Sequence, residues 1–225
     1  MILTIAAIQE EQALASLQSG LSALTWRDGM ATAGPAAREV KRNEQAVMGD
    51  AAGKAMSRAL TPLISDNPVV KAAARPRRIS ALMIARTGQG GHYGAHVDNA
   101  FMGGAAARLR SDISFTLFLT EPGDYEGGEL VVHAAGMTQS IKANAGELVL
   151  YPSTSIHEVR PVTSGTRTVC VGWIESQIRD LSQREMLFDL ENLRATLRTK
   201  IPNDAAELLT LDKTIANLLR MWGHA

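Results

Sequence analysis

The middle of the chain, from about Arg77 to Ser176, alternates short β-prone segments with turn-forming residues, and this pattern constrains the fold most strongly. Segments such as SDISFTLFLT, GGELVVHA, GELVLYP and RTVCVGWIES are rich in β-branched and aromatic residues, with Gly, Pro, Asn and Ser clusters between them. Closely spaced short strands of this kind are typical of a sandwich, a jelly roll or a barrel. The pattern therefore predicts an antiparallel β core.

Helical patterns precede and follow this block. The segment IQEEQALASLQSGLSAL repeats apolar residues at helical spacing. The segment KRNEQAVMGDAAGKAMSRALTPLI is a second amphipathic run, in which we expect Pro62 to end or kink the helix. After Gln177, RDLSQREMLFDLENLRATLRTK and AAELLTLDKTIANLLRMW also carry apolar stripes. We therefore expect an α+β protein whose residues 1 to about 70 are mostly helical and whose β core is followed by further helices.

Composition narrows the functional classes. The 23 basic and 23 acidic residues give a formal net charge of zero, which argues against nonspecific binding to nucleic acid or to a membrane surface. Cys170 is the single cysteine, so an intrachain disulfide and a cysteine-based zinc site are excluded. The start MILTIAAIQEEQALASL lacks the features of a signal peptide, and no apolar run reaches the roughly 18 residues of a membrane span. We expect a cytoplasmic protein.

The segment GGHYGAHVDNAF carries two candidate metal ligands. His96 and Asp98 are two positions apart, so on an extended strand their side chains share one face. Two ligands hold a metal weakly, and among the five histidines His157 is the best third candidate because it lies where another strand begins. Two histidines and one carboxylate with open coordination positions form the facial triad of non-haem Fe(II) oxygenases. Zinc hydrolases use similar ligands, so the triad alone leaves the reaction open.

Arg167 is a candidate anchor for an organic acid beside this site. It follows His157 by ten residues, across an expected turn at residues 163–165, and a hairpin there would return Arg167 to the same end of the core. An arginine binds a carboxylate through two parallel hydrogen bonds. The distal carboxylate of 2-oxoglutarate needs such a partner when its keto-acid end chelates iron. Trp173 shares the strand face of Arg167 and is expected to line the same pocket.

Four segments together resemble a known family. They are HYGAHVDNAF, YEGGELVV, GELVLYPSTSIHEVRPVTSGTR and the upstream TAGPAAREVKRNEQ. The chain is similar to bacterial PKHD-type hydroxylases, which are Fe(II)/2-oxoglutarate-dependent dioxygenases with a prolyl/lysyl-hydroxylase-type domain. The resemblance runs from about Thr32 into the C-terminal helices. It implies a double-stranded β-helix, or jelly roll, over residues 78–177, with an N-terminal helical region, 1–77, packed on it and a C-terminal helical region, 178–225.

The resemblance also implies a chemistry. Fe(II) would be held by His96, Asp98 and His157, and 2-oxoglutarate by Arg167. The enzyme would use O2 to hydroxylate an unactivated C–H bond while 2-oxoglutarate is decarboxylated to succinate and CO2, with ascorbate as a reductant. Alanine or glycine in place of Asp98 would open a site for halide, so the aspartate favours hydroxylation over halogenation.

One segment departs from the family pattern. Relatives commonly have Asn-Arg-Tyr where this chain has Ala85-Arg86-Thr87, and the Asn and Tyr side chains of that strand help to hold the co-substrate in related oxygenases. Ala85 has no side chain for this role. Thr87 keeps a hydroxyl on a shorter arm and is a candidate 2-oxoglutarate contact. The departure therefore affects the secondary contacts and leaves the triad and Arg167 intact.

Residues around the triad are candidate substrate contacts. Tyr93, Asn99 and Trp173 are assigned to the substrate pocket, although packing and capping of the loop explain Tyr93 and Asn99 as well. His92 is interpreted as a loop histidine rather than a ligand. Cys170 alternates away from the face of Arg167, so we expect it to be buried and structural.

Two other readings of the function remain open. One is a metal-dependent hydrolase or isomerase on a cupin-like barrel, against which the spacing of Arg167 argues. The other is a catalytically silent sensor of metal or 2-oxoglutarate. The expected substrate is a small molecule or a peptide: prolyl or lysyl residues, a free amino acid and a siderophore-like molecule all remain possible. The helical flanks would either close a homo-oligomer or buttress the barrel.

Overall fold

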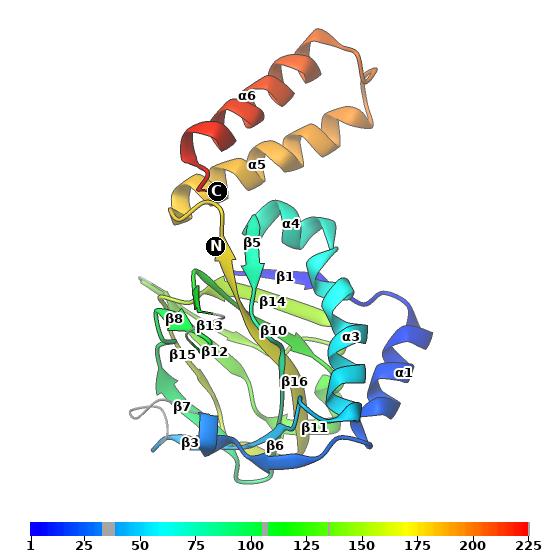
Figure 1. The fold of residues 1–225 in the computed structure, drawn as a ribbon, viewed down its shortest axis with the longest axis vertical. Coiled ribbons are helices and arrows are strands. Elements are labelled where there is room, and N and C mark those ends of the chain that lie inside the picture. The colour runs from blue at the N-terminus through cyan, green and yellow to red at the C-terminus, as the bar shows by residue number, and fades with distance from the viewer. Residues whose placement is uncertain (33–38, 105–107, 135, 225) are drawn as a thin grey trace.

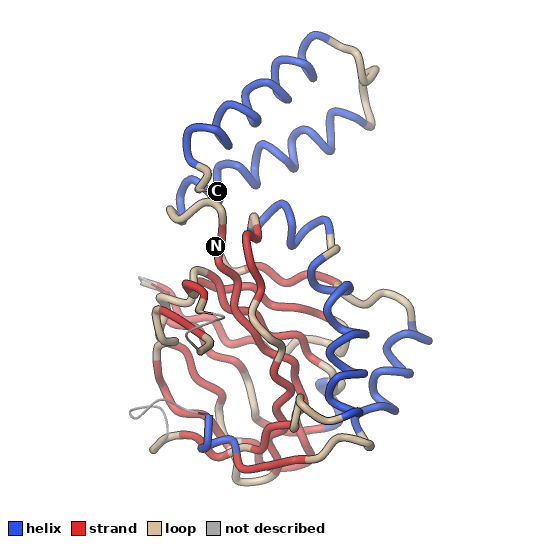
Figure 2. Tube along the Cα trace, in the orientation of Figure 1, coloured by secondary structure: helices blue, strands red, loops and turns tan. Residues whose placement is uncertain are grey.

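The computed structural model describes residues 1–32, 39–104, 108–134 and 136–224. Six residues of the TAGPAAREVKRNEQ segment lie outside this described part. Two antiparallel sheets form the core, helices α1, α3 and α4 lie beside them, and helices α5 and α6 stand off one end (Figures 1 and 2). The helices are α1 (Glu11–Leu21), α3 (Ala51–Ser65), α4 (Pro68–Ala74), α5 (Leu181–Arg198) and α6 (Ala206–Trp222), with short 3-10 turns η1 (Gly29–Thr32) and η3 (Pro122–Asp124).

The larger sheet carries the long strand that runs through the whole core. In the described part of the chain its order is β1-β14-β10-β16-β6-β4-β2, and β5 and β11 also pair with β16. Its strands are β1 (Leu3–Ala6), β2 (Trp26–Asp28), β4 (Glu44–Ala46), β5 (Pro76–Ile79), β6 (Met83–Gly88), β10 (Ile113–Phe118), β11 (Tyr125–Gly127), β14 (Glu147–Pro152) and β16 (Val162–Ser176).

The smaller sheet faces the inner side of the larger one. Its order among the described residues is β13-β12-β15-β7-β3, and a separate two-stranded ladder, β8-β9, lies nearby. Buried residues from both sheets, including Phe118, Leu130 and Val169, form one hydrophobic cluster between them. The strands are β3 (Lys41–Arg42), β7 (His92–His96), β8 (Phe101–Met102), β9 (Leu109–Arg110), β12 (Leu130–Ala134), β13 (Met137–Ile141) and β15 (Ile156–Val159).

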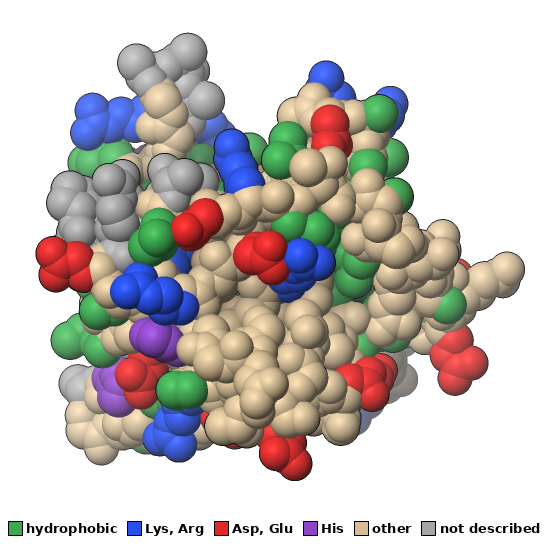
Figure 3. Space-filling view, turned by 90° about the horizontal axis from the view of Figure 1, so that it is seen from below, with side chains coloured by type: hydrophobic (Ala, Val, Ile, Leu, Met, Phe, Trp, Pro, Cys, Tyr) green, Lys and Arg blue, Asp and Glu red, His purple; other side chains and the backbone are tan. Residues whose placement is uncertain are grey.

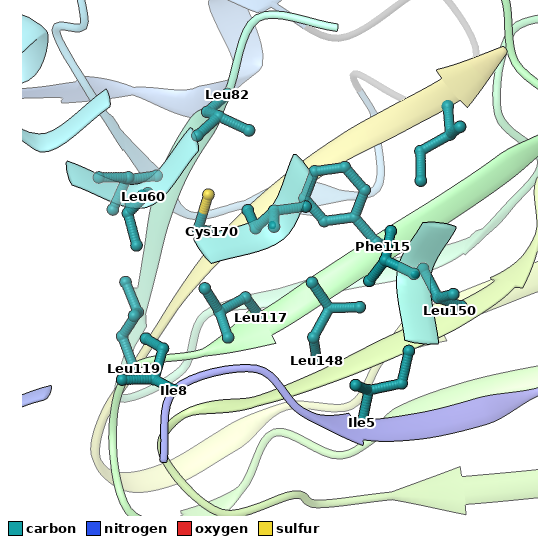
Figure 4. Close-up of a cluster of buried hydrophobic side chains, with 14 of the residues drawn as sticks. Ile5, Ile8, Leu60, Leu82, Phe115, Leu117, Leu119, Leu148, Leu150 and Cys170 are labelled. Carbon is teal, nitrogen blue, oxygen red and sulfur yellow. The ribbon is translucent and has the colours of Figure 1, made fainter. Parts of the chain in front are cut away.

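Alternation along the strands separates the two sides of the larger sheet. On β10, Phe115 and Leu117 pack into the cluster that also holds Leu60 of α3 (Figure 4). Phe118 belongs instead to the cluster between the two sheets. Side chains of successive strand residues point to opposite faces, so one strand serves both layers. Cys170 lies in the cluster on the helical side and is fully buried, as expected.

Helix α3 shows how local sequence begins an element. The Asp50 side chain accepts a hydrogen bond from the Gly53 N–H at 2.7 Å, which is a helix N-cap. Met56, Leu60 and Ile64, spaced four apart, are its large buried side chains. The stripe places one face of the helix on the larger sheet.

The expectation of a mostly helical N-terminal region was partly wrong. Lys41–Arg42 forms β3, Glu44–Ala46 forms β4, and Leu3–Ala6 forms β1, which pairs with β14. These short strands depend on partners far along the chain, which local periodicity does not reveal. Pro62 does not end α3, which continues to Ser65.

The α5–α6 hairpin has a small apolar core of its own. Leu187 and Ile215 are buried in it together with Ile178, which precedes α5. An ion pair between Arg75 and Glu191 ties the hairpin to α4.

On the face of the molecule seen from below, basic and acidic side chains are interspersed (Figure 3). The helices of the described chain are too short or too polar to cross a bilayer.

A close approach at Gly172 gives a stability prediction. Gly172 pairs with Phe115 across β16 and β10, and an added Cβ would lie 2.5 Å from Phe115 Cζ. Because Phe115 is fully buried, it has little room to move. We expect Gly172→Ala to destabilise the fold by about 1–3 kcal/mol, measured as a lower urea midpoint. The control is Gly123→Ala, where no described atom lies within 4 Å of the added Cβ; equal midpoints would contradict the prediction.

Candidate metal centre and co-substrate cavity

The structure brings His96, Asp98 and His157 together between the sheets. His96 ends β7, Asp98 follows two residues later, and His157 on β15 pairs directly with His96. One ligand atom from each of the three lies within 4.8 Å of the other two. His157 Nε2 is 3.7 Å from Asp98 Oδ2. The predicted cluster is therefore present, and its two imidazoles and one carboxylate suit Fe(II).

Backbone carbonyls fix the orientation of both histidine rings. His96 Nδ1 lies 2.8 Å from the Gly94 carbonyl oxygen, and His157 Nδ1 lies 3.1 Å from that of Ser155. An Nδ1–H that donates to a carbonyl leaves the Nε2 lone pair for a metal. Burial lowers the pKa of His96 to about 4, and the neighbouring His157 adds to the shift. His96 is therefore neutral near pH 7, as metal binding requires.

Aromatic rings restrain the two histidines further. Tyr93 stacks on His96 with 3.7 Å between ring centroids and 15° between planes. Tyr151 meets His157 edge-on at 5.0 Å. Stacked and edge-to-face pairs are both favourable aromatic geometries. Tyr93, assigned from the sequence to the substrate pocket, thus also supports a ligand, and the role of Tyr151 was not foreseen.

A buried serine pair holds the carboxylate of Asp98. The Ser114 hydroxyl donates to Asp98 Oδ2 at 2.5 Å, and Ser153 Oγ lies 2.7 Å from Ser114 Oγ. Both serines are 2% exposed. Ser114 is on β10 and Ser153 follows β14, so the contact depends on strand pairing across the sheet. No local pattern in the sequence predicts this contact.

A cavity of about 350 Å³ opens beside the triad. Arg167, Val169, Val171 and Trp173 line it from alternate positions of β16. The sequence pattern predicted this shared face for Arg167 and Trp173. The predicted hairpin at residues 163–165 is wrong, because β15 and β16 belong to different sheets and residues 163–165 lie within β16. Arg167 lines the cavity because strand β16 runs along the cavity from Arg167 at one end to Trp173 at the other.

Arg167 forms the basic end of this cavity. Its side chain is 3% exposed, and burial lowers its pKa, an effect opposed by Tyr125 and Tyr151. Its Nε has no hydrogen-bond partner among the described residues. A buried cation with an unused donor requires an acceptor to complete it. A carboxylate of a bound acid fits this need.

Thr87 and Ala85 occupy the positions beside Arg167 that the sequence comparison singled out. Thr87 pairs directly with Arg167 across β6 and β16, and Ala85 pairs with Val169. Both line the cavity, as does Asn99. His92, in contrast, is not among the described residues that line it. His92, which the sequence analysis interpreted as a loop histidine, is instead the first residue of strand β7.

Comparison with known proteins decides the family. The model of the 2OG-Fe(II) oxygenase superfamily matches residues 82–175, and that of the PKHD-type hydroxylase C-terminal domain matches residues 182–224. A PKHD-type hydroxylase of Hyphomonas neptunium is 47% identical over 221 residues, covering 98% of this chain and 99% of that protein. The chain belongs to the PKHD-type hydroxylases. It is therefore an Fe(II)/2-oxoglutarate-dependent dioxygenase, and the resemblance found in the sequence is confirmed.

Solved structures share the fold of this PKHD-type hydroxylase. A prolyl hydroxylase from Trichoplax adhaerens, solved with a hypoxia inducible factor peptide fragment, aligns with a TM-score of 0.60 and 15% identity, covering 77% of this chain and 83% of that one. HygX from Streptomyces hygroscopicus, solved with nickel, 2-oxoglutarate and hygromycin B, aligns with a TM-score of 0.51 and 13% identity, covering 78% and 82%. The predicted jelly roll within an α+β chain is confirmed. The family implies Fe(II), 2-oxoglutarate and O2 as its cofactor and co-substrates.

Proposed function

We propose that this enzyme hydroxylates an unactivated C–H bond of a small molecule or peptide, with conversion of 2-oxoglutarate and O2 to succinate and CO2. One oxygen atom enters the product hydroxyl and the other enters succinate. The observation that carries the proposal is the joint placement of His96, Asp98, His157 and Arg167 on one cavity. A three-residue metal site and a buried carboxylate anchor together suit a metal-bound keto acid better than either does alone.

In this proposal His96, Asp98 and His157 hold Fe(II) and leave the remaining coordination positions to ligands from the cavity. When bound, the iron supplies the activation of O2. The protein orients the ligand side chains and excludes water from the site. The carbonyls of Gly94 and Ser155 would hold the two Nδ1 atoms and leave the Nε2 atoms for the metal, and the enclosing sheets bury His157 to 5% exposure.

Arg167 is proposed to bind the distal carboxylate of 2-oxoglutarate. Its guanidinium lies in a buried environment, where a charge-assisted hydrogen bond is stronger than in water. Thr87, directly across the strand pair, is placed to add a hydroxyl contact, whereas Ala85 adds none. Ascorbate as a reductant belongs to the same proposal, and we assign it no binding residue.

The substrate class follows the range of ligands that this fold accepts. The Trichoplax enzyme was solved with a peptide and HygX with hygromycin B, so the fold accommodates both kinds of ligand. We also propose a cytoplasmic location, supported by the lone cysteine, Cys170, which is free and buried.

A second candidate function is a catalytically silent metal/2-oxoglutarate sensor. In the family pattern that the chain resembles, Asn and Tyr stand where this chain has Ala85 and Thr87. The loss of those contacts to 2-oxoglutarate would weaken turnover and leave the metal ligands in place. The discriminating experiment supplies Fe(II), 2-oxoglutarate, O2 and a panel of amino acids and peptides, and measures succinate. The proposed dioxygenase releases succinate that depends on O2 and Fe(II). Binding of both cofactors without succinate across the panel would favour the sensor.

The Ser114 contact gives a prediction for metal affinity. Ser114→Ala removes the hydrogen bond to Asp98 Oδ2, so the carboxylate loses its fixed orientation. Loss of such an outer partner typically weakens metal binding about 10–100-fold. We expect a decrease in Fe(II) affinity of that size in anaerobic calorimetry, with Ser140→Ala, an exposed serine of β13, as the control. Wild-type affinity in Ser114→Ala would show that this hydrogen bond does not support the metal site.

A further inference from the structure

Tyr125 is a buried polar residue to which the proposed function gives no role. It begins β11 and belongs to the segment YEGGELVV, which helps to carry the family resemblance. The residue is 2% exposed, and its Oη is buried without a hydrogen-bond partner among the described residues. A phenol both donates and accepts hydrogen bonds. Because a buried polar group without a partner destabilises the fold, this one calls for an explanation.

Strand pairing places Tyr125 beside Arg167. Tyr125 lies opposite Gly165 in the pairing of β11 with β16, two positions before Arg167. Diagonal neighbours across an antiparallel pair are within reach of aromatic and long side chains. Gly128 shows that these two side chains do come together, because a Cβ added there would lie 3.1 Å from Arg167 Cδ and 3.1 Å from Tyr125 Cε2. The side chains of Tyr125 and Arg167 therefore adjoin the same point of the backbone.

Neighbouring residues restrain both side chains. Lys142 Nζ donates to the backbone carbonyl of Tyr125 at 2.6 Å and lies 4.3 Å from the centroid of its ring. The guanidinium carbon of Arg167 lies 5.1 Å from the centroid of the Phe118 ring. Side chains that are already restrained lose little further rotamer freedom when they form a hydrogen bond. Tyr125 and Arg167 are thus prepared for a contact with each other.

The donors of Arg167 outnumber those that a carboxylate can take. A guanidinium has five N–H donors and no acceptor, and a carboxylate bound through two parallel hydrogen bonds leaves the others to different partners. Arg167 is 3% exposed, so those partners must come largely from the protein. Burial lowers the pKa of Arg167, and Tyr125 opposes this shift more than any other residue. Burial raises the pKa of Tyr125, so its phenol is neutral at pH 7 and its oxygen can accept.

We propose that Tyr125 is a positioning residue for the co-substrate: its phenol oxygen accepts a hydrogen bond from the Arg167 guanidinium and thereby orients the N–H groups that bind the distal carboxylate. This inference rests on the proposed binding of 2-oxoglutarate at Arg167. Tyr125 acts through Arg167 and not on the metal end of the co-substrate. It therefore contributes to the selection of a keto diacid over a keto acid that lacks the second carboxylate.

The test compares two keto acids in binding without turnover. Anaerobic, Fe(II)-loaded protein is titrated with 2-oxoglutarate or with 2-oxovalerate, which has a methyl group in place of the distal carboxylate, and the visible charge-transfer band is followed. We expect Tyr125→Phe to weaken 2-oxoglutarate about tenfold or more, the size of a lost hydrogen bond to a charged group. The affinity for 2-oxovalerate should stay within about threefold of the wild type, because this ligand makes no use of Arg167. Circular dichroism confirms the fold of the variant.

A double variant tests whether Tyr125 acts through Arg167. In the Arg167→Met background, Tyr125→Phe should change the affinity for 2-oxoglutarate by less than about twofold, because its partner is already gone. A further loss of about tenfold there would overturn the inference, since Tyr125 would then act independently of Arg167. Unchanged 2-oxoglutarate affinity in Tyr125→Phe alone, or an equal loss for both keto acids, would also overturn it. A wild-type protein without the band, or without a preference for 2-oxoglutarate over 2-oxovalerate, would instead refute the proposed function.

Discussion

Replacement of His96 by alanine should abolish stoichiometric binding of Fe(II) while the fold persists. His96 provides one of three ligand atoms that lie within 4.8 Å of one another, and its ring is fixed by the Gly94 carbonyl and by Tyr93. Loss of an outer partner alone costs about 10–100-fold in metal affinity, so loss of a ligand should cost more than about 100-fold. The measurement is anaerobic calorimetric titration with Fe(II), with circular dichroism to confirm the fold.

His92→Ala is the matched control for this change. His92 lies on the same strand, β7, but is not among the described residues that line the cavity. Its Nδ1 lies 3.4 Å from the Gly90 carbonyl oxygen. We expect wild-type affinity for Fe(II) in this variant. Retention of wild-type iron binding in His96→Ala, or equal loss in both variants, would contradict the assigned triad.

Replacement of Arg167 by methionine should separate 2-oxoglutarate binding from iron binding. The guanidinium is buried and its Nε lacks a partner among the described residues, so its removal leaves a bound carboxylate without its counter-charge. Truncation of one partner of a buried charge pair costs about 2–5 kcal/mol, or at least about 30-fold in affinity. Fe(II) affinity should change by less than about threefold, because Arg167 is not among the triad residues. Both affinities are measured by anaerobic titration.

Arg86→Met provides the control for charge removal on the neighbouring strand. Arg86 is on β6 but points away from the cavity, where it pairs with Glu44 and covers the Trp26 ring. We expect 2-oxoglutarate affinity near that of the wild type in this variant. Unchanged affinity in Arg167→Met would contradict the co-substrate assignment, as would an equal loss of iron in Arg167→Met and His96→Ala.

The parts of the site that the sequence predicted depend on short-range geometry. Two-residue alternation places His96 with Asp98, and Arg167 with Trp173, on common faces once the strands are recognised. His157 was added because strand-like sequence surrounds it, and its pairing with His96 agrees with that assignment. The metal-site prediction therefore needed few assumptions about the rest of the fold.

The parts that the sequence did not reveal depend on pairing between distant strands. Ser114 contacts Asp98 from 16 positions away, and Ser153, the residue after β14, contacts Ser114. Lys41 reaches the cavity through the pairing of β3 with β7, from a segment whose spacing resembled a helix. A strand of two or three residues has too little alternation to outweigh a neighbouring amphipathic pattern, so tertiary pairing decides its conformation.

Anaerobic titration with Fe(II) and 2-oxoglutarate tests the central claim most directly. A keto acid that chelates Fe(II) at His96, Asp98 and His157 produces a visible metal-to-ligand charge-transfer band. We expect this band to require both ligands, to saturate at one equivalent of each, and to be absent in His96→Ala. Saturating Fe(II) and 2-oxoglutarate that produce no band in the wild-type protein would contradict the assignment of this cavity as the co-substrate site.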